Sequence, residues 1–246
     1  MEKHSLVTDL INKGKIFDLV PEFFMGRPME KKEMIAIFNF FGAFWEYDGA
    51  PCPGKPHAIL KSGKHSNGFI SCKEVLKYPC LNDLFANEIV KILNAEETEK
   101  IDVVVSSAYS AITLGFNVAS ILRFENNEKI EYIPVEKDKK GNPTIILGGI
   151  DSSKRVLIIN ELMTTGSGST WETKKAVLKC NGKNPPPIII ETSYVLVHRS
   201  KDYELPDGSK VQPIFHFDMK DIDLETEVCP YCQAGSEAIK PKIGNN

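Results

Sequence analysis

The chain has 246 residues, of which 42% are hydrophobic and 26% charged, a composition that is ordinary for a globular protein. Its 30 basic and 33 acidic residues give a formal net charge of −3, which excludes a broadly basic nucleic-acid surface but allows a local cationic pocket for a small anion. The sequence contains no apolar run of membrane-spanning or signal-peptide type, and its six cysteines are too sparse for a disulfide scaffold. We therefore expect a reduced, cytoplasmic protein.

The first fifty residues have a helical pattern. Residues 1–29 are predicted to form an N-terminal helical extension that breaks at Gly26-Arg27-Pro28, and residues 31–47 a second, aromatic-rich helical stretch. The Pro- and Gly-rich segment 49–56 is predicted to be a loop. The expected organisation is this extension followed by one domain over residues 30–246.

Beyond the loop, short β-branched runs alternate with helical patterns. The runs lie at 101–105, 130–135, 156–159 and 188–190, the last continuing to 194–197, and helix candidates lie at 81–94, 110–124 and 169–180. This alternation predicts an α/β fold with a mostly parallel sheet and helices on both faces. Ligands of such sheets bind beyond the carboxyl ends of the strands, so the residues directly after each run are the candidates for a site.

The most informative segment is residues 156–170, VLIINELMTTGSGST. A buried strand brings Asn160 and Glu161 to its end, and a loop of small residues leads into a helix near Ser169, which has capping-box spacing to Glu172. Backbone N–H groups, hydroxyls and the helix dipole can together bind a phosphate monoester, while Glu161 can accept hydrogen bonds from ribose hydroxyls. The alternative is a polar strand-to-helix turn. A Walker loop is excluded because no GK[ST] follows.

Several motifs in unbroken order resemble the type I phosphoribosyltransferases, and among them the orotate phosphoribosyltransferase family. The segment VLIINELMTTG is similar to the signature of an apolar strand, two acids and a Thr-Thr/Ala-Gly loop. Residues 60–66, LKSGKHS, and 72–79, CKEVLKYP, are similar to two further stretches of the orotate enzymes. The tail from Cys229-Pro230-Tyr231-Cys232 onward also resembles one branch of them. The resemblance runs from about residue 31 to 242.

The resemblance implies a parallel-sheet core with a small hood, formed by parts of 50–80 and by the C-terminal region. It implies transfer of the phosphoribosyl group from phosphoribosyl pyrophosphate to orotate, which gives orotidine 5′-phosphate and pyrophosphate in pyrimidine nucleotide biosynthesis. Mg²⁺ is the implied cofactor, the partners are these small molecules, and a homodimer is expected. Neither nucleic acid nor a membrane is an expected partner.

The resemblance also implies roles for individual residues. Glu161, Lys137 and Lys140 carry catalysis, with Glu161 the one candidate to help hold Mg²⁺ beside the substrate. Phe69 and Arg199 hold the base, and the loop Glu136–Asn142 closes over the site. The residues implied to bind phosphoribosyl pyrophosphate are Lys61, Ser107, Ala108, Tyr109, Lys139, Asn160, Thr164, Thr165, Gly166, Ser167, Gly168 and Ser169.

Four departures from the family pattern fall on these motifs. Asn160 stands where the family has an acid, and Glu136 and Gly148 stand where basic residues are usual. The loop after the 101–105 run, SSAYSAI, lacks the usual glycine pair. Two alternatives therefore stay open, a non-catalytic sensor of a phosphoribosyl ligand and a transferase for another nucleobase. Arg199 argues against a purine, which offers no carboxylate.

Cys229 and Cys232 have the spacing of metal ligands. A structural zinc site needs four ligands, and here the set would have to be completed by Cys52, His57 or His65 from far along the chain. From the sequence we expect a tail turn with two thiols in preference to a zinc site.

Overall fold

The computed structural model describes residues 5–47, 56–60, 62–95, 100–126, 129–145, 148–165 and 168–241. The chain divides into two compact units, each assembled from segments that are distant in sequence. Unit 1 comprises Met1–Asp18, Glu30–Val75 and Asp218–Asn246, and unit 2 comprises Leu19–Met29 and Leu76–Phe217. One boundary between the units falls between Met29 and Glu30, and another falls between Asp18 and Leu19, so residues 1–18 group with unit 1 and residues 19–29 with unit 2. The expected organisation into an extension and one domain stays a prediction.

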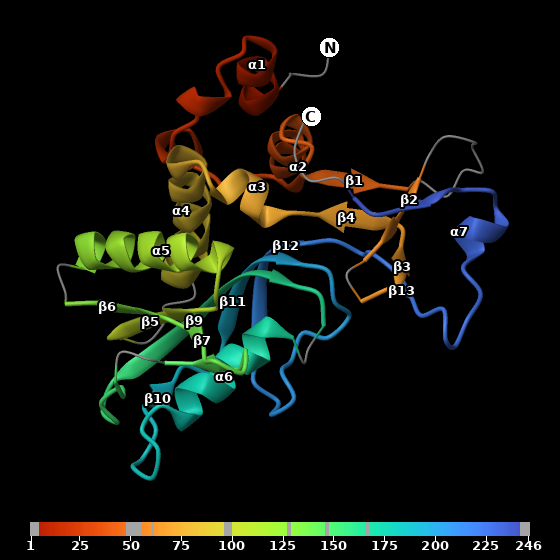
Figure 1. Ribbon diagram of the computed structural model, residues 1–246. Coiled ribbons are helices and arrows are strands. Elements are labelled where there is room, and N and C mark those ends of the chain that lie inside the picture. The colour runs from red at the N-terminus through yellow and green to blue at the C-terminus, as the bar shows by residue number, and fades with distance from the viewer. Residues whose placement is uncertain are drawn as a thin grey trace. The chain divides into compact units, whose positions relative to one another are not determined.

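Unit 2 is built on a parallel sheet of order β12-β11-β9-β5-β6, with β10 paired to the first residues of β9 (Figure 1). Every pairing in this sheet is parallel, as predicted. The strands are β5 (Val103–Ser106), β6 (Glu131–Pro134), β9 (Arg155–Met163), β10 (Ile188–Ile189), β11 (Ser193–His198) and β12 (Val211–His216).

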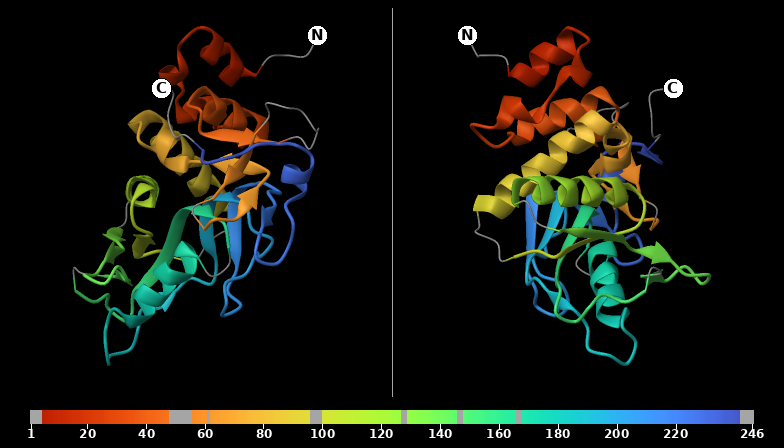
Figure 2. Two further views of the ribbon diagram at one scale, coloured as in Figure 1. Left: turned by 45° about the vertical axis from the view of Figure 1, so that its right-hand side comes forward. Right: turned by 90° about the vertical axis from the view of Figure 1, so that its left-hand side faces the viewer.

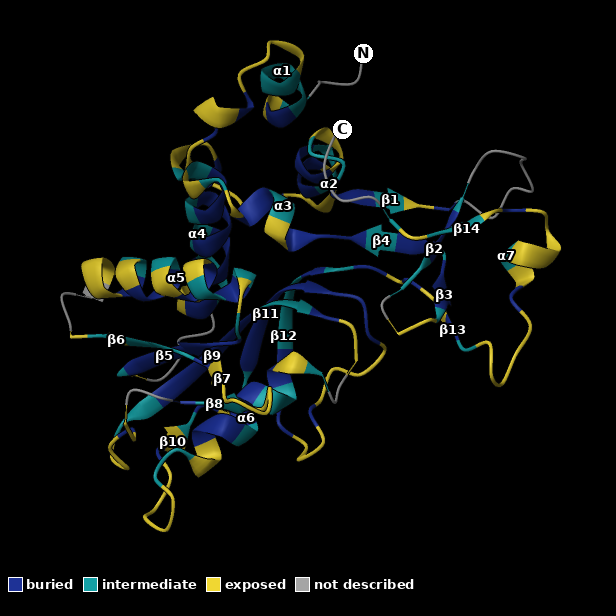
Figure 3. Cartoon of the chain, in the orientation of Figure 1, coloured by how far each residue is buried: buried dark blue, intermediate teal, exposed yellow. Residues whose placement is uncertain are grey.

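Helices cover both faces of the sheet of unit 2. Helix α4 (Pro79–Ala95) packs with α5 (Ser110–Asn126) on one face, and α6 (Ser169–Lys179) lies on the other (Figure 2). These helices match the predicted ranges to within two residues at each end. The central strands are accordingly buried along most of their length (Figure 3), which explains why their sequences are continuous apolar runs.

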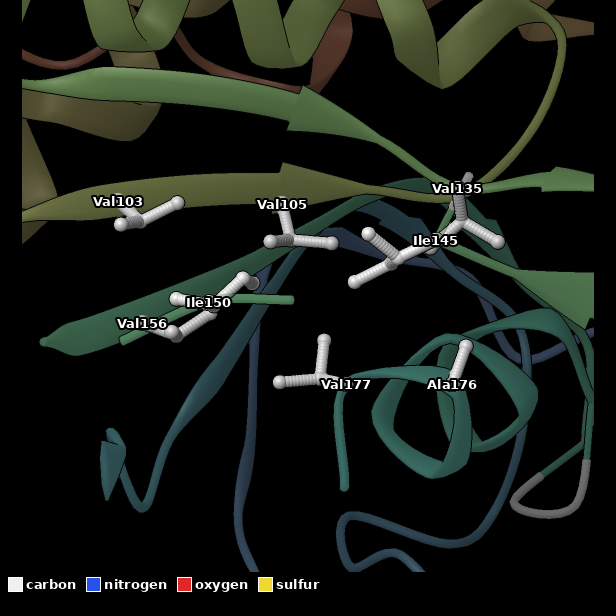
Figure 4. Close-up of a cluster of buried hydrophobic side chains, with 8 residues drawn as sticks. All are labelled: Val103, Val105, Val135, Ile145, Ile150, Val156, Ala176 and Val177. Carbon is white, nitrogen blue, oxygen red and sulfur yellow. The ribbon is translucent and has the colours of Figure 1, made fainter. Parts of the chain in front are cut away.

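A cluster of apolar side chains, β-branched except for Ala176, joins the sheet to α6 (Figure 4). Its buried members are Val103, Val105, Val135, Ile145, Ile150, Val156, Ala176 and Val177. Val135 and Ile145 directly flank a hairpin of β7 (Glu136–Lys137) and β8 (Pro143–Thr144), so the core anchors both ends of that hairpin. Burial of each such side chain stabilises the fold by about 1.5–3 kcal/mol.

Unit 1 contains a small sheet of order β13-β3-β2-β14. Its strands are β2 (His57–Ile59), β3 (His65–Ser66), β13 (Asp221–Ile222) and β14 (Ala238–Ile239), and α7 (Pro230–Gln233) lies between β13 and β14 in the chain. A second pair joins β1 (Phe44–Glu46) to β4 (Gly68–Ile70). Except for β1, these strands come from the two regions expected to form the hood.

The N-terminal region is helical only in part. It forms α1 (Leu6–Asn12), two 3₁₀ turns η1 (Ile16–Asp18) and η2 (Pro21–Phe24), and α2 (Lys31–Phe40); a short α3 (Cys72–Leu76) follows β4. The prediction of one helical stretch over 31–47 is wrong beyond Phe40, because the aromatic residues after it form β1 and pair with β4. In the described part of the chain, no helix combines the length and apolarity needed to cross a membrane.

Candidate active site

The predicted phosphoribosyl-binding residues of unit 2 follow four neighbouring strands. The loop from Ser107 follows β5, the hairpin β7–β8 follows β6, the segment from Thr164 follows β9, and Arg199 follows β11. Because β5, β6, β9 and β11 run parallel, these segments all lie at the carboxyl edge of the sheet, where ligands of such folds bind.

The carboxylate of Glu161 is held from the β5 side. Its Oε1 accepts a hydrogen bond from Ser110 Oγ at 2.9 Å, and its Oε2 lies 3.4 Å from Ser107 Oγ. The side chain is half-buried, and burial raises the pKa of this carboxyl, which the two hydroxyls partly oppose. Each carboxylate oxygen can accept more than one hydrogen bond, so this arrangement can also accept hydrogen bonds from ligand hydroxyls.

Asn160 lies behind Glu161 and is completely buried. Its Oδ1 accepts hydrogen bonds from Ser107 Oγ and from the backbone N–H of Glu161. Its Nδ2 lies 2.7 Å from Ser169 Oγ, 2.8 Å from Thr170 Oγ1 and 3.1 Å from a backbone carbonyl of β9. Asn160 therefore connects the β5 loop with the first turn of α6. The direct ribose contact implied by the resemblance stays a prediction.

The segment between β9 and α6 presents a helix N-terminus. Thr164 and Thr165 are exposed, Gly168 is the N-cap, and no side chain in the described part of the chain caps the helix. The expected capping box is wrong, because Ser169 is already the first helical residue and its hydroxyl contacts Asn160 instead. Gly166 and Ser167 lie outside the described residues. The uncapped first turn offers N–H groups and the positive end of the helix dipole to an anion.

The loop after β5 has an unusual backbone. Ser107 is buried, Ala108 half-buried and Tyr109 exposed, and Tyr109 has a φ of 70°, the one positive φ among the described residues other than glycine. Below this loop the Ser106 hydroxyl lies 2.8 Å from the hydroxyl of Tyr132, and burial raises the pKa of Tyr132 to about 12. A strained backbone held by its surroundings is a frequent feature of functional loops.

The loop predicted to close over the site is a β-hairpin with an ordered turn. Asp138 accepts hydrogen bonds from the backbone N–H groups of Lys140 and Asn142, both at 2.8 Å, and from the Asn142 side chain. These bonds hold the pKa of Asp138 below its usual range. Lys137, Lys139 and Lys140 are exposed, and Lys137 Nζ lies 5.2 Å from the ring centre of Tyr109. The hairpin therefore carries three cations and contacts the β5 loop.

The two residues predicted to hold the base belong to different units. Arg199 of unit 2 is buried at the end of β11, and its backbone N–H donates to Met163 O at 2.9 Å. Phe69 of unit 1 lies on β4 with its ring 6.3 Å from that of Trp45. Lys61 lies outside the described residues.

Some residues at this edge were not singled out from the sequence. Ser110 holds Glu161; it lies in the stretch SSAYSAI, but the resemblance gave it no role of its own. A surface pocket of about 580 Å³ beside Thr165 is lined by residues 201–206, which have no recognisable motif. Ser110 and residues 201–206 can be recognised as part of the site only once the structure shows which strand ends lie side by side.

A second cluster lies in unit 1. The ligand atoms of His57, His65, Cys229 and Cys232 all lie within 4.8 Å of one another. Cys229 is the N-cap of α7 and Cys232 lies within that helix, so the predicted turn with two thiols is present. β2 and β3 bring the two histidines to it, so the fold assembles four candidate ligands, two of which the sequence named as able to complete the set.

Comparisons with known proteins agree with this architecture. No family model matches the sequence. The orotate phosphoribosyltransferase of Caldanaerobacter subterraneus subsp. tengcongensis is 27% identical over 215 residues, covering 87% of this chain and 97% of that protein. The orotate phosphoribosyltransferase of Pelotomaculum thermopropionicum is 28% identical over 214 residues, with the same coverage.

A solved structure supports the fold. The crystal structure of orotate phosphoribosyltransferase from Francisella tularensis superposes with a TM-score of 0.51 at 18% identity, covering 75% of this chain and 86% of that one. This likeness supports the fold, and the two sequence relatives extend along most of the chain. The chain is therefore similar in sequence to orotate phosphoribosyltransferases over most of its length, and it shares the α/β fold of the Francisella tularensis structure.

Proposed function

We propose that this protein transfers the phosphoribosyl group of phosphoribosyl pyrophosphate to orotate, forming orotidine 5′-phosphate and pyrophosphate in pyrimidine nucleotide synthesis. The observation that carries the proposal is the convergence of Glu161, the β5 loop and the N-terminus of α6 at one edge of the parallel sheet. That edge belongs to a chain homologous to orotate phosphoribosyltransferases over 87% of its length.

The first turn of α6 is suited to the 5′-phosphate. Its N–H groups and dipole favour an anion, and the exposed hydroxyls of Thr164 and Thr165 lie in the segment that leads to it. No lysine is needed for such a site, because backbone amides carry the recognition. In this proposal the phosphate anchors the substrate and Glu161 accepts hydrogen bonds from the ribose hydroxyls.

The hairpin lysines act on the leaving group. Cleavage of the bond at the anomeric carbon develops positive charge on the sugar and releases a highly charged pyrophosphate. Lys137, Lys139 and Lys140 can neutralise that anion, and a hairpin closed over the site would exclude water from the sugar cation. The contact of Lys137 with Tyr109 supports this role, since Tyr109 belongs to the loop assigned to pyrophosphate.

Arg199 is assigned to the orotate carboxylate. A guanidinium offers two parallel N–H donors to a carboxylate, and such pairs are both stronger and more specific than contacts with a lysine. The position of Arg199 directly after β11 supports the assignment, because it places the residue at the substrate edge of the sheet. Phe69 is assigned to the base from the resemblance alone.

We propose Mg²⁺ as the cofactor, bound chiefly through the substrate. Magnesium is commonly held by one or two carboxylates together with phosphate oxygens and waters. Glu161 supplies one oriented carboxylate at this edge, so the residues present fit that pattern. When bound, the ion would lower the negative charge on the pyrophosphate that leaves.

Two further features of the family are proposed here. We infer a homodimer, which is supported by the exposed aromatic residues Phe116 and Phe124 on α5, 56% and 89% accessible. Light scattering behind a sizing column tests it. We also infer a reducing, cytoplasmic location, which is supported by the five described cysteines all being free thiols.

The transfer reaction has a direct test. The purified protein is incubated with Mg²⁺, phosphoribosyl pyrophosphate and orotate, and the loss of orotate absorbance is followed. We expect turnover that requires all three components and that falls by about 10²–10³-fold in Glu161→Gln. Binding of phosphoribosyl pyrophosphate without turnover would overturn the proposal in favour of a sensor, and turnover with adenine or hypoxanthine alone would overturn the choice of base.

A further inference from the structure

We propose that His57, His65, Cys229 and Cys232 bind one zinc ion, which forms a structural site in unit 1. All four residues belong to unit 1, whereas all but two of the residues assigned to the transfer reaction belong to unit 2, and none of the four is among those assigned residues. The inference is therefore independent of the proposed function.

Four of the six separations between the ligand atoms are close to those of a tetrahedral site, and the other two are at most 4.8 Å. His57 Nε2 and His65 Nδ1 are 3.0 Å apart, and Cys232 Sγ is 3.4 Å from each of them. Cys229 Sγ is 3.5 Å from His57 Nε2. Tetrahedral zinc with ordinary Zn–N and Zn–S bond lengths separates its ligand atoms by about 3.3–3.8 Å. The four printed separations therefore need to change by only a few tenths of an ångström to accommodate the ion.

The fold of unit 1 presents these ligands in two pairs. On the small sheet, His65 of β3 is directly opposite Ile59 of β2, and His57 precedes Ile59 by two residues. Side chains two residues apart in a strand lie on the same face, so both imidazoles emerge on one side of the sheet. Cys229 and Cys232 flank the start of α7, a spacing that directs two thiols to one point.

Hydrogen bonding alone does not account for the cluster. His57 Nε2 lies within 3.5 Å of three potential partners, the imidazole of His65 and the two thiols. A ring nitrogen has either one hydrogen or one lone pair, so it can satisfy only one of them properly. A cation at the centre of the four atoms makes one bond to each.

The surroundings of His57 fit a metal ligand. Its other ring nitrogen, Nδ1, lies 3.0 Å from the hydroxyl of Ser236, and both residues are buried. A metal-bound histidine commonly donates its second N–H in this way, which fixes the tautomer and the orientation of the ring. The other ring nitrogen of His57, Nε2, would then be free to bind the proposed zinc ion.

The donor set selects the metal and its role. Two imidazoles and two thiolates suit zinc, and within the described residues no carboxylate joins the cluster to favour Mg²⁺ or Ca²⁺. Four protein ligands leave no open position for a substrate, which is the pattern of structural sites. The ion would attach the C-terminal segment, including β14, to the sheet formed by β2 and β3.

Metal analysis of the full-length protein tests the site. The untagged protein, expressed with zinc and purified under reducing conditions, should contain about one zinc ion per chain by mass spectrometry. The double variant Cys229→Ser/Cys232→Ser should lose it. Cys80→Ser is the matched control, a half-buried cysteine outside the cluster, and should retain zinc. His65→Cys, which replaces one zinc ligand by another, should also retain it.

The wild-type protein gives a second test that does not depend on a variant folding. Titration with a mercurial that blocks thiols should release zinc to a colorimetric indicator in step with modification of Cys229 and Cys232, located by peptide mapping. Absence of zinc, a stoichiometric metal other than zinc, a disulfide between Cys229 and Cys232 in the freshly isolated protein, or zinc that survives loss of both cysteines would overturn the proposal.

Discussion

The side-chain amide of Asn160 lies 2.8 Å from the hydroxyl of Thr170, and this contact joins the end of β9 to the first turn of α6. Both residues are buried, and the same amide also contacts Ser169 Oγ and the carbonyl of Leu162. An asparagine can donate two hydrogen bonds at this point, whereas the acid usual in the family can donate none when ionised. The asparagine at residue 160, where the family usually has an acid, therefore fits the hydrogen-bond acceptors around it.

Asn160→Asp should destabilise the protein at neutral pH by about 1–3 kcal/mol, because an ionised carboxylate would face the Leu162 carbonyl without a hydrogen to donate. Burial would raise the folded-state pKa of the new carboxyl, so the loss should be smaller at pH 5 than at pH 8. Urea unfolding at both pH values measures this loss of stability, and Asn184→Asp, at an exposed residue, is the control. Unchanged stability together with faster transfer would instead support direct contact of residue 160 with ribose.

Glu161→Gln should separate activity from stability. Loss of the carboxylate should lower kcat/KM by about 10²–10³-fold, the range for removal of one group that stabilises charge in a transition state. Burial raises the pKa of Glu161 above 4.5, which means that folding disfavours its charged form. That cost is absent below pH 4.5 and develops as the pH rises through the raised pKa. Gln should therefore raise the melting temperature at pH 8 but not at pH 4.

Wild-type activity in Glu161→Gln would remove the ribose role assigned to this residue. A melting temperature that falls equally at both pH values would show that the Ser107 and Ser110 contacts matter more to stability than the burial of charge. Ser110→Ala, which leaves the carboxylate in place but removes one of its two hydroxyl partners, is the matched variant. Its kcat/KM should lie between those of the wild type and Glu161→Gln.

The sequence is sufficient to predict five of the six strands in the sheet of unit 2 and its three covering helices. Continuous apolar runs such as 156–159 are distinctive because both faces of each strand are buried. Strand β12 was not predicted, since Pro213 and three half-buried positions disguise it at the sheet edge. The strands of unit 1 have only two or three residues, which is too short to show a period of two.

The site was predictable only as far as strand ends are recognisable. The sequence indicates that residues 160 and 161 end a strand, but the hydrogen bonds that bury Asn160 and leave Glu161 half-exposed come from Ser107, Ser110 and Thr170. The histidine–cysteine cluster was not predictable from spacing, because His57 and Cys229 are brought together by the pairing of β14 with β2.

Tyr109→Ala should weaken binding of phosphoribosyl pyrophosphate without loss of fold. The contact between Lys137 and the Tyr109 ring is exposed, and such contacts contribute about 0.5–1 kcal/mol, which corresponds to a rise in KM of about two- to fivefold. Tyr109→Phe retains the ring and should leave KM unchanged. Steady-state kinetics at saturating orotate measure both. Equal effects of the two variants would place the importance of residue 109 in its hydroxyl and not in its ring.

Asp207 should stabilise unit 2 in a pH-dependent manner. Its carboxylate lies 2.6 Å from Nζ of the buried Lys174, and hydrogen bonds from Lys174 and Ser209 outweigh desolvation and lower its pKa from 3.8 to about 2. The stabilisation is complete above pH 3.8 and is lost as the pH falls towards 2. Because a third of the Asp207 side chain is exposed, solvent screening limits it to about 1 kcal/mol.

Urea unfolding of Asp207→Asn at pH 7 and pH 3 tests this assignment. The free energy of unfolding of the variant should be lower than that of wild type by about 1 kcal/mol at pH 7 and by less at pH 3. The control variant Asp218→Asn, at an exposed residue, should unfold with the wild-type free energy at both pH values. A deficit that is the same at both pH values would mean that Asp207 acts through packing and not through its charge.

Gly149→Ala should destabilise the segment that follows the hairpin. A Cβ at residue 149 would clash with Asn181 Oδ1, and that amide is fixed because it accepts from Ile150 N–H and donates to the carbonyls of Ile150 and Pro185. We expect a loss of about 1–3 kcal/mol, typical of overpacking. In an Asn181→Ala background the same substitution should cost less, since the obstructing atom is gone. Thermal unfolding of the four proteins gives the coupling, with Gly26→Ala, which meets nothing within 4 Å, as control. Additive effects of the two substitutions would show that the backbone around residue 149 relaxes to accommodate the new methyl group. The Asn181 side chain would then not be the reason that residue 149 is a glycine.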